Sequence, residues 1–169
     1  LTSVAAFTRE FRSGGAQLAG LVHNAGAMPA AYEQSPQGHE LTMSLHVLGP
    51  IAMTDALAPV LHDARVVFVT SGGMYLQQLR ADDPEYRAED YRPTRAYARS
   101  KRAQVELLPD LQERWGDFGI SVSAMHPGWS DTPGVSDSLP GFARLTGPLL
   151  RSPDDGADTI VWLLARPED

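Results

Sequence analysis

The stretch Arg65-Val66-Val67-Phe68-Val69-Thr70-Ser71-Gly72-Gly73 decides the fold of this chain. Its unbroken run of β-branched and aromatic residues is typical of a buried strand, and the glycines after Ser71 end that strand. Two shorter apolar runs, 18–23 and 120–125, predict further strands. We therefore expect three short strands, each followed at once by polar or turn-forming residues.

Helical patterns alternate with these strands. Apolar residues recur at helical spacing over 2–13, 36–61 and 94–115, and Ser35 is expected to cap the second of these helices. A last helix starts at Ser152-Pro153, with Ile160, Val161 and Leu164 expected on its inner side. Pro50 and Pro109 are expected to kink their helices or to be absorbed in them. This alternation predicts an α/β fold, a doubly wound parallel sheet with helices on both faces.

The three strand ends carry the motifs of the chain. They are Asn24-Ala25-Gly26, Ser71-Gly72-Gly73 and His126-Pro127-Gly128. Ligands of parallel sheets bind outside the carboxyl ends of the strands. The sequence therefore predicts a ligand site at this edge, next to two loops over 72–93 and 127–152.

Tyr97 and Lys101 lie one helical turn apart on one face of the helix predicted over 94–115. A free phenol has a pKa of about 10, and an ammonium group held beside it lowers that pKa. A tyrosine tuned in this way acts as a general acid or base on a carbonyl or alcohol, whose oxygen Ser71 can also hold. The pattern predicts the chemistry of a carbonyl reductase or alcohol dehydrogenase; the plainer alternative is an exposed helical pair.

Composition narrows the class of protein. The 169 residues suit one domain, and the net charge of −7 argues against a nucleic-acid or anionic-membrane surface. With no cysteine and no metal-ligand spacing among the histidines, we expect no metal site. No apolar run reaches the roughly 18 residues of a membrane helix, and no signal-peptide pattern is present, so we expect no membrane span and a cytoplasmic location.

Taken in order, the motifs resemble those of the short-chain dehydrogenase/reductase superfamily over essentially the whole chain. They are Asn24-Ala25-Gly26, Ser71, Tyr97-x-x-x-Lys101 and Pro127-Gly128-x-x-x-Thr132. Finer matches over 70–74, 125–135, 139–142 and 155–159 resemble the branch of dehydrogenase/reductase SDR family member 12 and its bacterial relatives. The resemblance implies a Rossmann-like sheet and an oxidoreductase that moves a hydride between NAD(P) and a carbonyl or alcohol.

The resemblance also assigns roles. It makes Tyr97 the acid/base, lets Lys101 bind the nicotinamide ribose while lowering the tyrosine pKa, and has Ser71 position the substrate oxygen. The residues that it implies contact NAD(P) are Asn24, Ala25, Gly26, Tyr97, Lys101, Pro127, Gly128 and Thr132. It further implies a homo-oligomer of the intact protein.

Two departures from the family pattern affect this reading. His46 stands where the family usually has an asparagine that anchors a water of the proton relay. A histidine can bind water and titrate near neutrality, so His46 either sustains the relay with a different pH profile or marks lost activity. The glycine-rich Thr-Gly-x-x-x-Gly-x-Gly loop is absent. We therefore expect residues 1–169 to be one partial domain, the C-terminal two-thirds of an enzyme, inactive by itself.

Alternatives remain for function and for the loops. One is a non-catalytic dinucleotide-binding or regulatory protein, and another is a nucleotide-sugar epimerase or dehydratase, which usually has a longer C-terminal domain. Apolar residues in the expected substrate loop, about 127–152, suggest a small lipophilic aldehyde, ketone or alcohol as substrate. The acidic residues within 72–93 are expected to form a solvated face, or else part of a substrate lid.

Overall fold

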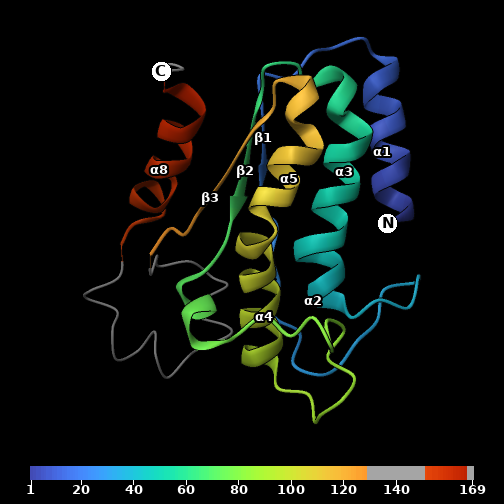
Figure 1. Ribbon diagram of the computed structural model, residues 1–169, viewed down its shortest axis with the longest axis vertical. Coiled ribbons are helices and arrows are strands. Elements are labelled where there is room, and N and C mark those ends of the chain that lie inside the picture. The colour runs from blue at the N-terminus through green and yellow to red at the C-terminus, as the bar shows by residue number, and fades with distance from the viewer. Residues whose placement is uncertain (129–150, 167–169) are drawn as a thin grey trace.

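The computed structural model describes residues 1–128 and 151–166. Within these residues, three parallel strands form one sheet in the order β1-β2-β3 (Figure 1). The strands are β1 (Gly20–His23), β2 (Arg65–Val69) and β3 (Ser121–Met125). Their register aligns His23 with Phe68, and Val69 with Met125, so the strands end at one edge. The expected α/β class and the expected strand positions are confirmed.

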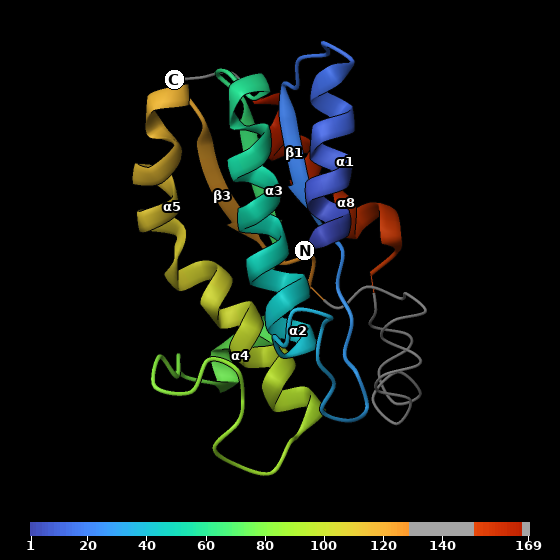
Figure 2. The same ribbon diagram turned by 90° about the vertical axis from the view of Figure 1, so that its right-hand side faces the viewer.

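Helices cover both faces of this sheet, as Figures 1 and 2 show. One face carries α1 (Thr2–Ser13), α3 (Gly49–Leu57), α4 (Pro93–Glu106) and α5 (Leu108–Trp115). The other face is covered by α8 (Pro153–Ala165). The chain alternates helix and strand as expected, with the predicted helix over 94–115 divided in two where Pro109 enters the first turn of α5.

The central strand β2 divides the core between the two faces. Val66 and Phe68 point to the α3 and α5 side, where they pack in one cluster with Leu57 and Trp115. Val67 and Val69 point to the other side, against Met125 and the inner residues of α8, Ile160, Leu163 and Leu164. This two-residue alternation explains why the run is apolar throughout. Each fully buried side chain of this size contributes about 1.5–3 kcal/mol.

The last helix starts as predicted but faces differently. Ser152 and Asp155 form a reciprocal capping box, which satisfies two backbone donors at the first turn. We expected Val161 on the inner side, and this was wrong, because Val161 and Trp162 are both more than half exposed. Successive residues of a helix are 100° apart, so Ile160 and Leu164 can share a face that Val161 leaves.

The second helix begins later than the sequence suggested. Ser35 was expected to cap it, but its N–H donates to the His39 carbonyl within a separate turn. The helix instead starts with a short turn α2 (Leu41–Met43), whose cap is Glu40: the carboxylate accepts from the Met43 N–H at 2.8 Å. The Glu40 N–H is bound in turn by the carboxylate of Glu85, so a distant contact sets this boundary.

Pro50 is absorbed by a π turn. Residues Ser44–Leu48 form one π-helical turn, η1, in which the Gly49 N–H reaches back to the Ser44 carbonyl. A proline has no N–H to donate to the carbonyl four residues earlier, here that of His46. The side chain of Gln104 supplies the missing donor, with Nε2 at 2.7 Å from the His46 carbonyl oxygen. The helix therefore continues without losing a buried hydrogen bond.

The helical stretch Leu41–Val60 differs from our expectation about membrane spans. Its mean hydropathy of 1.2 over 18 residues makes it long and apolar enough, by composition alone, to cross a membrane. Half of that window is buried inside the fold, where the stretch packs between α1 and α4. The buried position accounts for the apolar composition.

Candidate active site

Ser71, Tyr97 and Lys101 come together at the carboxyl end of β2. Ser71 directly follows the strand region and caps a short 3₁₀ turn, η3 (Gly72–Leu76), by accepting from the Gly73 N–H at 3.3 Å. Its side chain also hydrogen-bonds to Tyr97. Tyr97 and Lys101 both project from the face of α4 that packs on η3 and η1. The exposed-pair alternative for these two residues is therefore wrong.

Lys101 is buried, and its ammonium group is held by the backbone. The residue is 2% exposed, and Nζ donates to the Val69 carbonyl at 2.7 Å. Nζ lies 5.7 Å from the centre of the Tyr97 ring. Burial lowers the pKa of Lys101 from 10.5 to about 8. The ammonium group thus loses a proton far more readily than that of an ordinary lysine.

The protonation of Tyr97 differs from the expectation. Burial raises the pKa of its phenol, an effect that the hydrogen bond from Ser71 partly offsets. The net shift is thus opposite to the expected lowering by Lys101, whose ammonium group is bound to the Val69 carbonyl and lies beside the ring. Tyr97 is therefore a neutral phenol at physiological pH.

His46 is fixed between three segments. Its Nε2 accepts from the Ala27 N–H at 3.1 Å, just beyond the end of β1. Its Nδ1 lies 2.7 Å from the Ser100 hydroxyl, which itself donates to the Tyr97 carbonyl. An Nε2 that accepts must be unprotonated, so the network assigns the proton to Nδ1. The ring stands edge-on to Tyr97 with centroids 5.3 Å apart.

This environment prevents His46 from titrating near neutrality. The residue is fully buried, and burial together with the charge of Lys101 lowers its pKa to about 3. The expectation of a histidine that changes charge near pH 6.5 is therefore wrong. The sequence could not reveal this, because both partners of the ring lie far along the chain.

The other expected cofactor residues lie at the same edge. Asn24, Ala25 and Gly26 are exposed after β1. A side chain at Gly26 would come within 3.3 Å of His46 Nε2 and 3.7 Å of Lys101 Nζ, so glycine keeps the space beside the ammonium group open. Gly128 follows β3 with a φ of 74°, a left-handed conformation that suits glycine. Pro127 precedes it, and Thr132 lies outside the described residues.

Two residues that the sequence analysis did not single out hold this site together. Gln104 follows Tyr97 by seven positions, on the same helical face, and binds the His46 carbonyl. Thr70 donates from Oγ1 to the Lys101 carbonyl at 2.8 Å. The sequence carries one signal for the amine that these two residues hold: Lys101 is its only lysine, whereas it has thirteen arginines.

The acidic loop between η3 and α4 is only partly solvated: Asp82, Glu89 and Asp90 are exposed as expected, whereas Asp83 is buried and Glu85 is half-buried. Asp83 is 8% exposed and accepts from the N–H groups of Arg87 and Ala88. Glu85 binds His39 at 2.7 Å, and Glu89 pairs with Arg99. The loop is thus fastened to both helices that carry the site.

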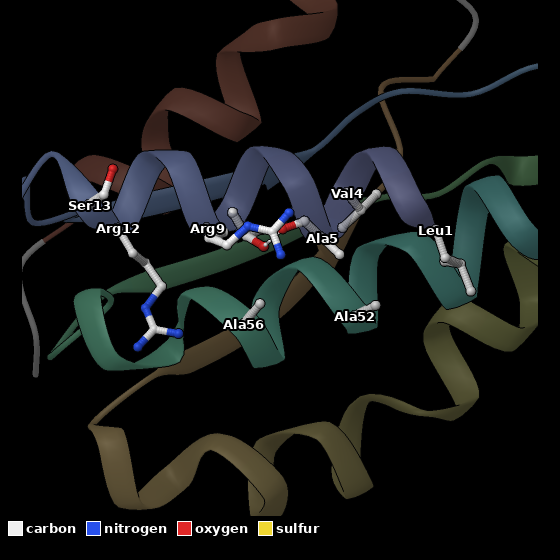
Figure 3. A pocket seen from close by; sticks show the side chains of 9 residues that line it. Leu1, Val4, Ala5, Arg9, Arg12, Ser13, Ala52 and Ala56 are labelled. Atoms are coloured by element: carbon white, nitrogen blue, oxygen red, sulfur yellow. Dashed lines mark hydrogen bonds between the residues drawn. The ribbon is translucent and has the colours of Figure 1, made fainter.

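A separate groove of about 670 Å³ lies between α1 and α3 (Figure 3). Its lining residues come from these two helices and include Val4, Arg9, Arg12 and Ala52. None of the expected site residues lines it, so this groove is not the site formed at the strand ends.

Comparison with known proteins places the chain in a family. Residues 1–166 match the family model described as Enoyl-(Acyl carrier protein) reductase. Dehydrogenase/reductase SDR family member 12 of Bos taurus is 45% identical over 152 residues, which cover 87% of this chain and 47% of that protein. The chain belongs to the short-chain dehydrogenase/reductase family.

Other family members match the chain along nearly its whole length. Polyprenol dehydrogenase of Homo sapiens is 32% identical over 182 residues, covering 99% of this chain and 54% of that protein. A short chain dehydrogenase from Burkholderia cenocepacia J2315, solved in complex with NADP, superposes with a TM-score of 0.71 at 23% identity. That match covers 98% of this chain and 65% of the solved one. This chain spans about half the length of the curated relatives that it matches.

Proposed function

We propose that the intact protein is an NAD(P)-dependent oxidoreductase that reduces a carbonyl group, with Tyr97 as the proton donor. The observation that carries this proposal is the convergence of Ser71, Tyr97 and Lys101 at one strand end. A hydroxyl, a phenol and a buried amine at this edge suit an oxygen that gains a proton. Membership of an oxidoreductase family supports the same chemistry.

The residues at this edge fit a nicotinamide cofactor. The missing side chain at Gly26 leaves space beside the Lys101 amine, and no carboxylate pairs with that amine among the described residues. Asn24, Ala25, Pro127 and Gly128 border the same edge. A reduced nicotinamide, when bound, supplies the hydride. The NADP held by the Burkholderia relative supports this choice, and the preference between NAD and NADP is left open.

The proton chemistry follows from the burial of the site. Tyr97 is neutral because burial raises its pKa, so it has a proton to donate at physiological pH. The Ser71 hydroxyl, next to the phenol, can orient the carbonyl oxygen. When Tyr97 gives up its proton, the positive charge of Lys101 stabilises the phenolate in a site with little water. The protonated phenol is the form of Tyr97 that a carbonyl reduction requires.

We further propose a lipophilic substrate. Tyr75 and Leu76, in the turn after Ser71, are 68% and 80% exposed. The Tyr75 ring stands edge-on to His126, which precedes the Pro127-Gly128 segment. Apolar side chains thus lie beside both strand ends of the site. A relative named polyprenol dehydrogenase is consistent with such a substrate.

A homo-oligomer and a cytoplasmic location remain proposals too. The oligomer rests on the family resemblance and the location on composition alone. The non-catalytic alternative keeps one supporting observation: both nitrogens of His46 already have protein partners, so the ring cannot serve a proton relay as it stands.

The test is cofactor oxidation by the intact protein with a panel of long-chain aldehydes and ketones. We expect Tyr97→Phe to lower kcat about 10²–10⁴-fold, the usual worth of a general acid, with little change in cofactor affinity measured by fluorescence quenching. Full activity of Tyr97→Phe would remove the assigned role. Tight cofactor binding by the wild type without turnover of any carbonyl would favour the non-catalytic alternative.

A further inference from the structure

Three consecutive residues at the end of β2 contact one turn of α4. The Val69 carbonyl accepts from Lys101 Nζ at 2.7 Å, and the Thr70 hydroxyl donates to the Lys101 carbonyl at 2.8 Å. Ser71 hydrogen-bonds to Tyr97, which precedes Lys101 by one helical turn. The strand end therefore holds Lys101 twice, once at its side chain and once at its backbone.

Thr70 is itself rigidly placed. It is 4% exposed, and its N–H donates to the Met125 carbonyl at 2.8 Å, which extends the pairing with β3 by one step. Because threonine is branched at Cβ, rotation about its χ1 bond is restricted. The Thr70 hydroxyl therefore holds the backbone of α4 at Lys101 in a fixed position relative to the sheet.

The bond from Thr70 is not needed to complete the helix. Lys101 lies in the interior of α4, where a carbonyl accepts from the N–H four residues later, and an oxygen with two lone pairs can accept a second donor. The hydroxyl thus adds a contact between strand and helix at the one residue whose amine must face the site. A valine would have the same shape and fill the same space without this contact.

We propose that Thr70 is a positioning residue for Lys101, whose backbone it fixes so that Nζ stays between the Val69 carbonyl and the Tyr97 ring. The inference rests on the proposed reduction, since it concerns the cation that stabilises the Tyr97 phenolate. Displacement of a catalytic group by about 1 Å can cost on the order of 10²-fold in rate. Loss of the hydroxyl is therefore expected to act on turnover rather than on substrate binding.

The environment of Lys101 gives a readout that does not depend on activity. The titratable groups that face it are Tyr97 on its own helix and His46 on η1, and no carboxylate is paired with it in the described residues. Burial alone lowers its pKa, so an amine that is less firmly held and better hydrated will titrate closer to 10.5. The ¹³C-labelled ε-methylene of Lys101 can be assigned in the intact protein by its loss in Lys101→Arg.

The experiment compares Thr70→Val and Thr70→Ser in the intact protein. Thr54→Val is the matched control, because Thr54 is also fully buried and its hydroxyl binds the His23 ring at 2.8 Å rather than the backbone of α4. We expect Thr70→Val to lower kcat about 10-fold or more, with the carbonyl KM changed less than about 2-fold. The Lys101 pKa should rise by about one unit in the same variant. Thr70→Ser, which keeps the hydroxyl, should restore both values, and Thr54→Val should leave both unchanged.

Several outcomes overturn the inference. If Thr70→Val keeps the wild-type kcat and the wild-type pKa of Lys101, the hydroxyl only forms a hydrogen bond with a nearby carbonyl and does not position Lys101. An equal loss in Thr54→Val means that any lost buried hydrogen bond has the same effect. If Thr70→Val does not fold, a 10-fold loss of kcat in the well-folded Thr70→Ser is sufficient to reject the role. An inactive wild type would reject the proposed reduction instead, while the Lys101 titration would still test the contact.

Discussion

Replacing Lys101 by methionine tests whether the buried amine destabilises the fold. The pKa falls from 10.5 in the unfolded chain to about 8 in the folded one. This difference corresponds to on the order of 3 kcal/mol against the folded state at pH values where both forms are charged. Methionine has a similar length and no charge, but it also loses the bond to the Val69 carbonyl, worth about 1–2 kcal/mol. We expect Lys101→Met to be about 1–2 kcal/mol more stable at pH 7.5.

The pH dependence gives the sharper result, and its sign follows from proton binding. Between pH 8 and 10.5 the unfolded lysine keeps a proton that the folded one has lost, so stability rises with pH in this window. From pH 7.5 to 9.5 the wild type should gain about 2 kcal/mol relative to Lys101→Met. Measurement below pH 10 limits the ionisation of unfolded tyrosines, and the comparison with Lys101→Met cancels the remainder.

The assay is urea unfolding of the intact wild type, Lys101→Met and Lys101→Arg at these two pH values. Groups elsewhere cancel in the difference between the proteins. An arginine stays charged throughout, so Lys101→Arg should show no gain relative to Lys101→Met. Parallel changes in the wild type and Lys101→Met would refute the reasoning, because they would mean that the amine is hydrated in the folded state.

Two further predictions concern His46 and its partner on α4. Gln104→Leu should lower the free energy of unfolding by about 1–3 kcal/mol, measured by urea denaturation, because it leaves the buried His46 carbonyl without its side-chain donor. The same change at the exposed Gln78, Gln78→Leu, should alter it little. In the pH profile of kcat/KM we expect no ionisation from His46 between pH 5 and 7, because its pKa is held at about 3. A step near 6.5 that disappears in His46→Asn would contradict this.

The strand pattern could be predicted because its causes are local. The run at β2 is apolar on both faces, which only a central strand between two helical layers requires. Parallel strands then bring Ser71 and the Gly26 and Gly128 segments to one edge without further information. The helical spacing of Tyr97 and Lys101 placed both on the same face of α4.

The start of the second helix and the charge states could not be predicted, because their causes are distant. Glu85 holds the N–H of Glu40, 45 residues earlier, and so overrides the local cap at Ser35. The protonation of Tyr97 depends on how deeply α4 packs and on where Lys101 directs its amine. Spacing along a helix fixes which residues share a face, but it does not fix the distance from an ammonium group to a phenol oxygen.

In the proposed reduction, the route by which Tyr97 would regain a proton follows from the surroundings of His46 and Lys101. Pro50 removes a backbone donor, Gln104 replaces it, and the resulting π turn places the His46 ring between Ala27 and Ser100. A ring with both nitrogens bonded and a pKa of about 3 braces the site but exchanges no protons near neutrality. Lys101 lies beside the phenol with a pKa of about 8, close enough to physiological pH to give and regain a proton. We therefore expect proton return to Tyr97 to depend on Lys101, with His46 supplying rigidity.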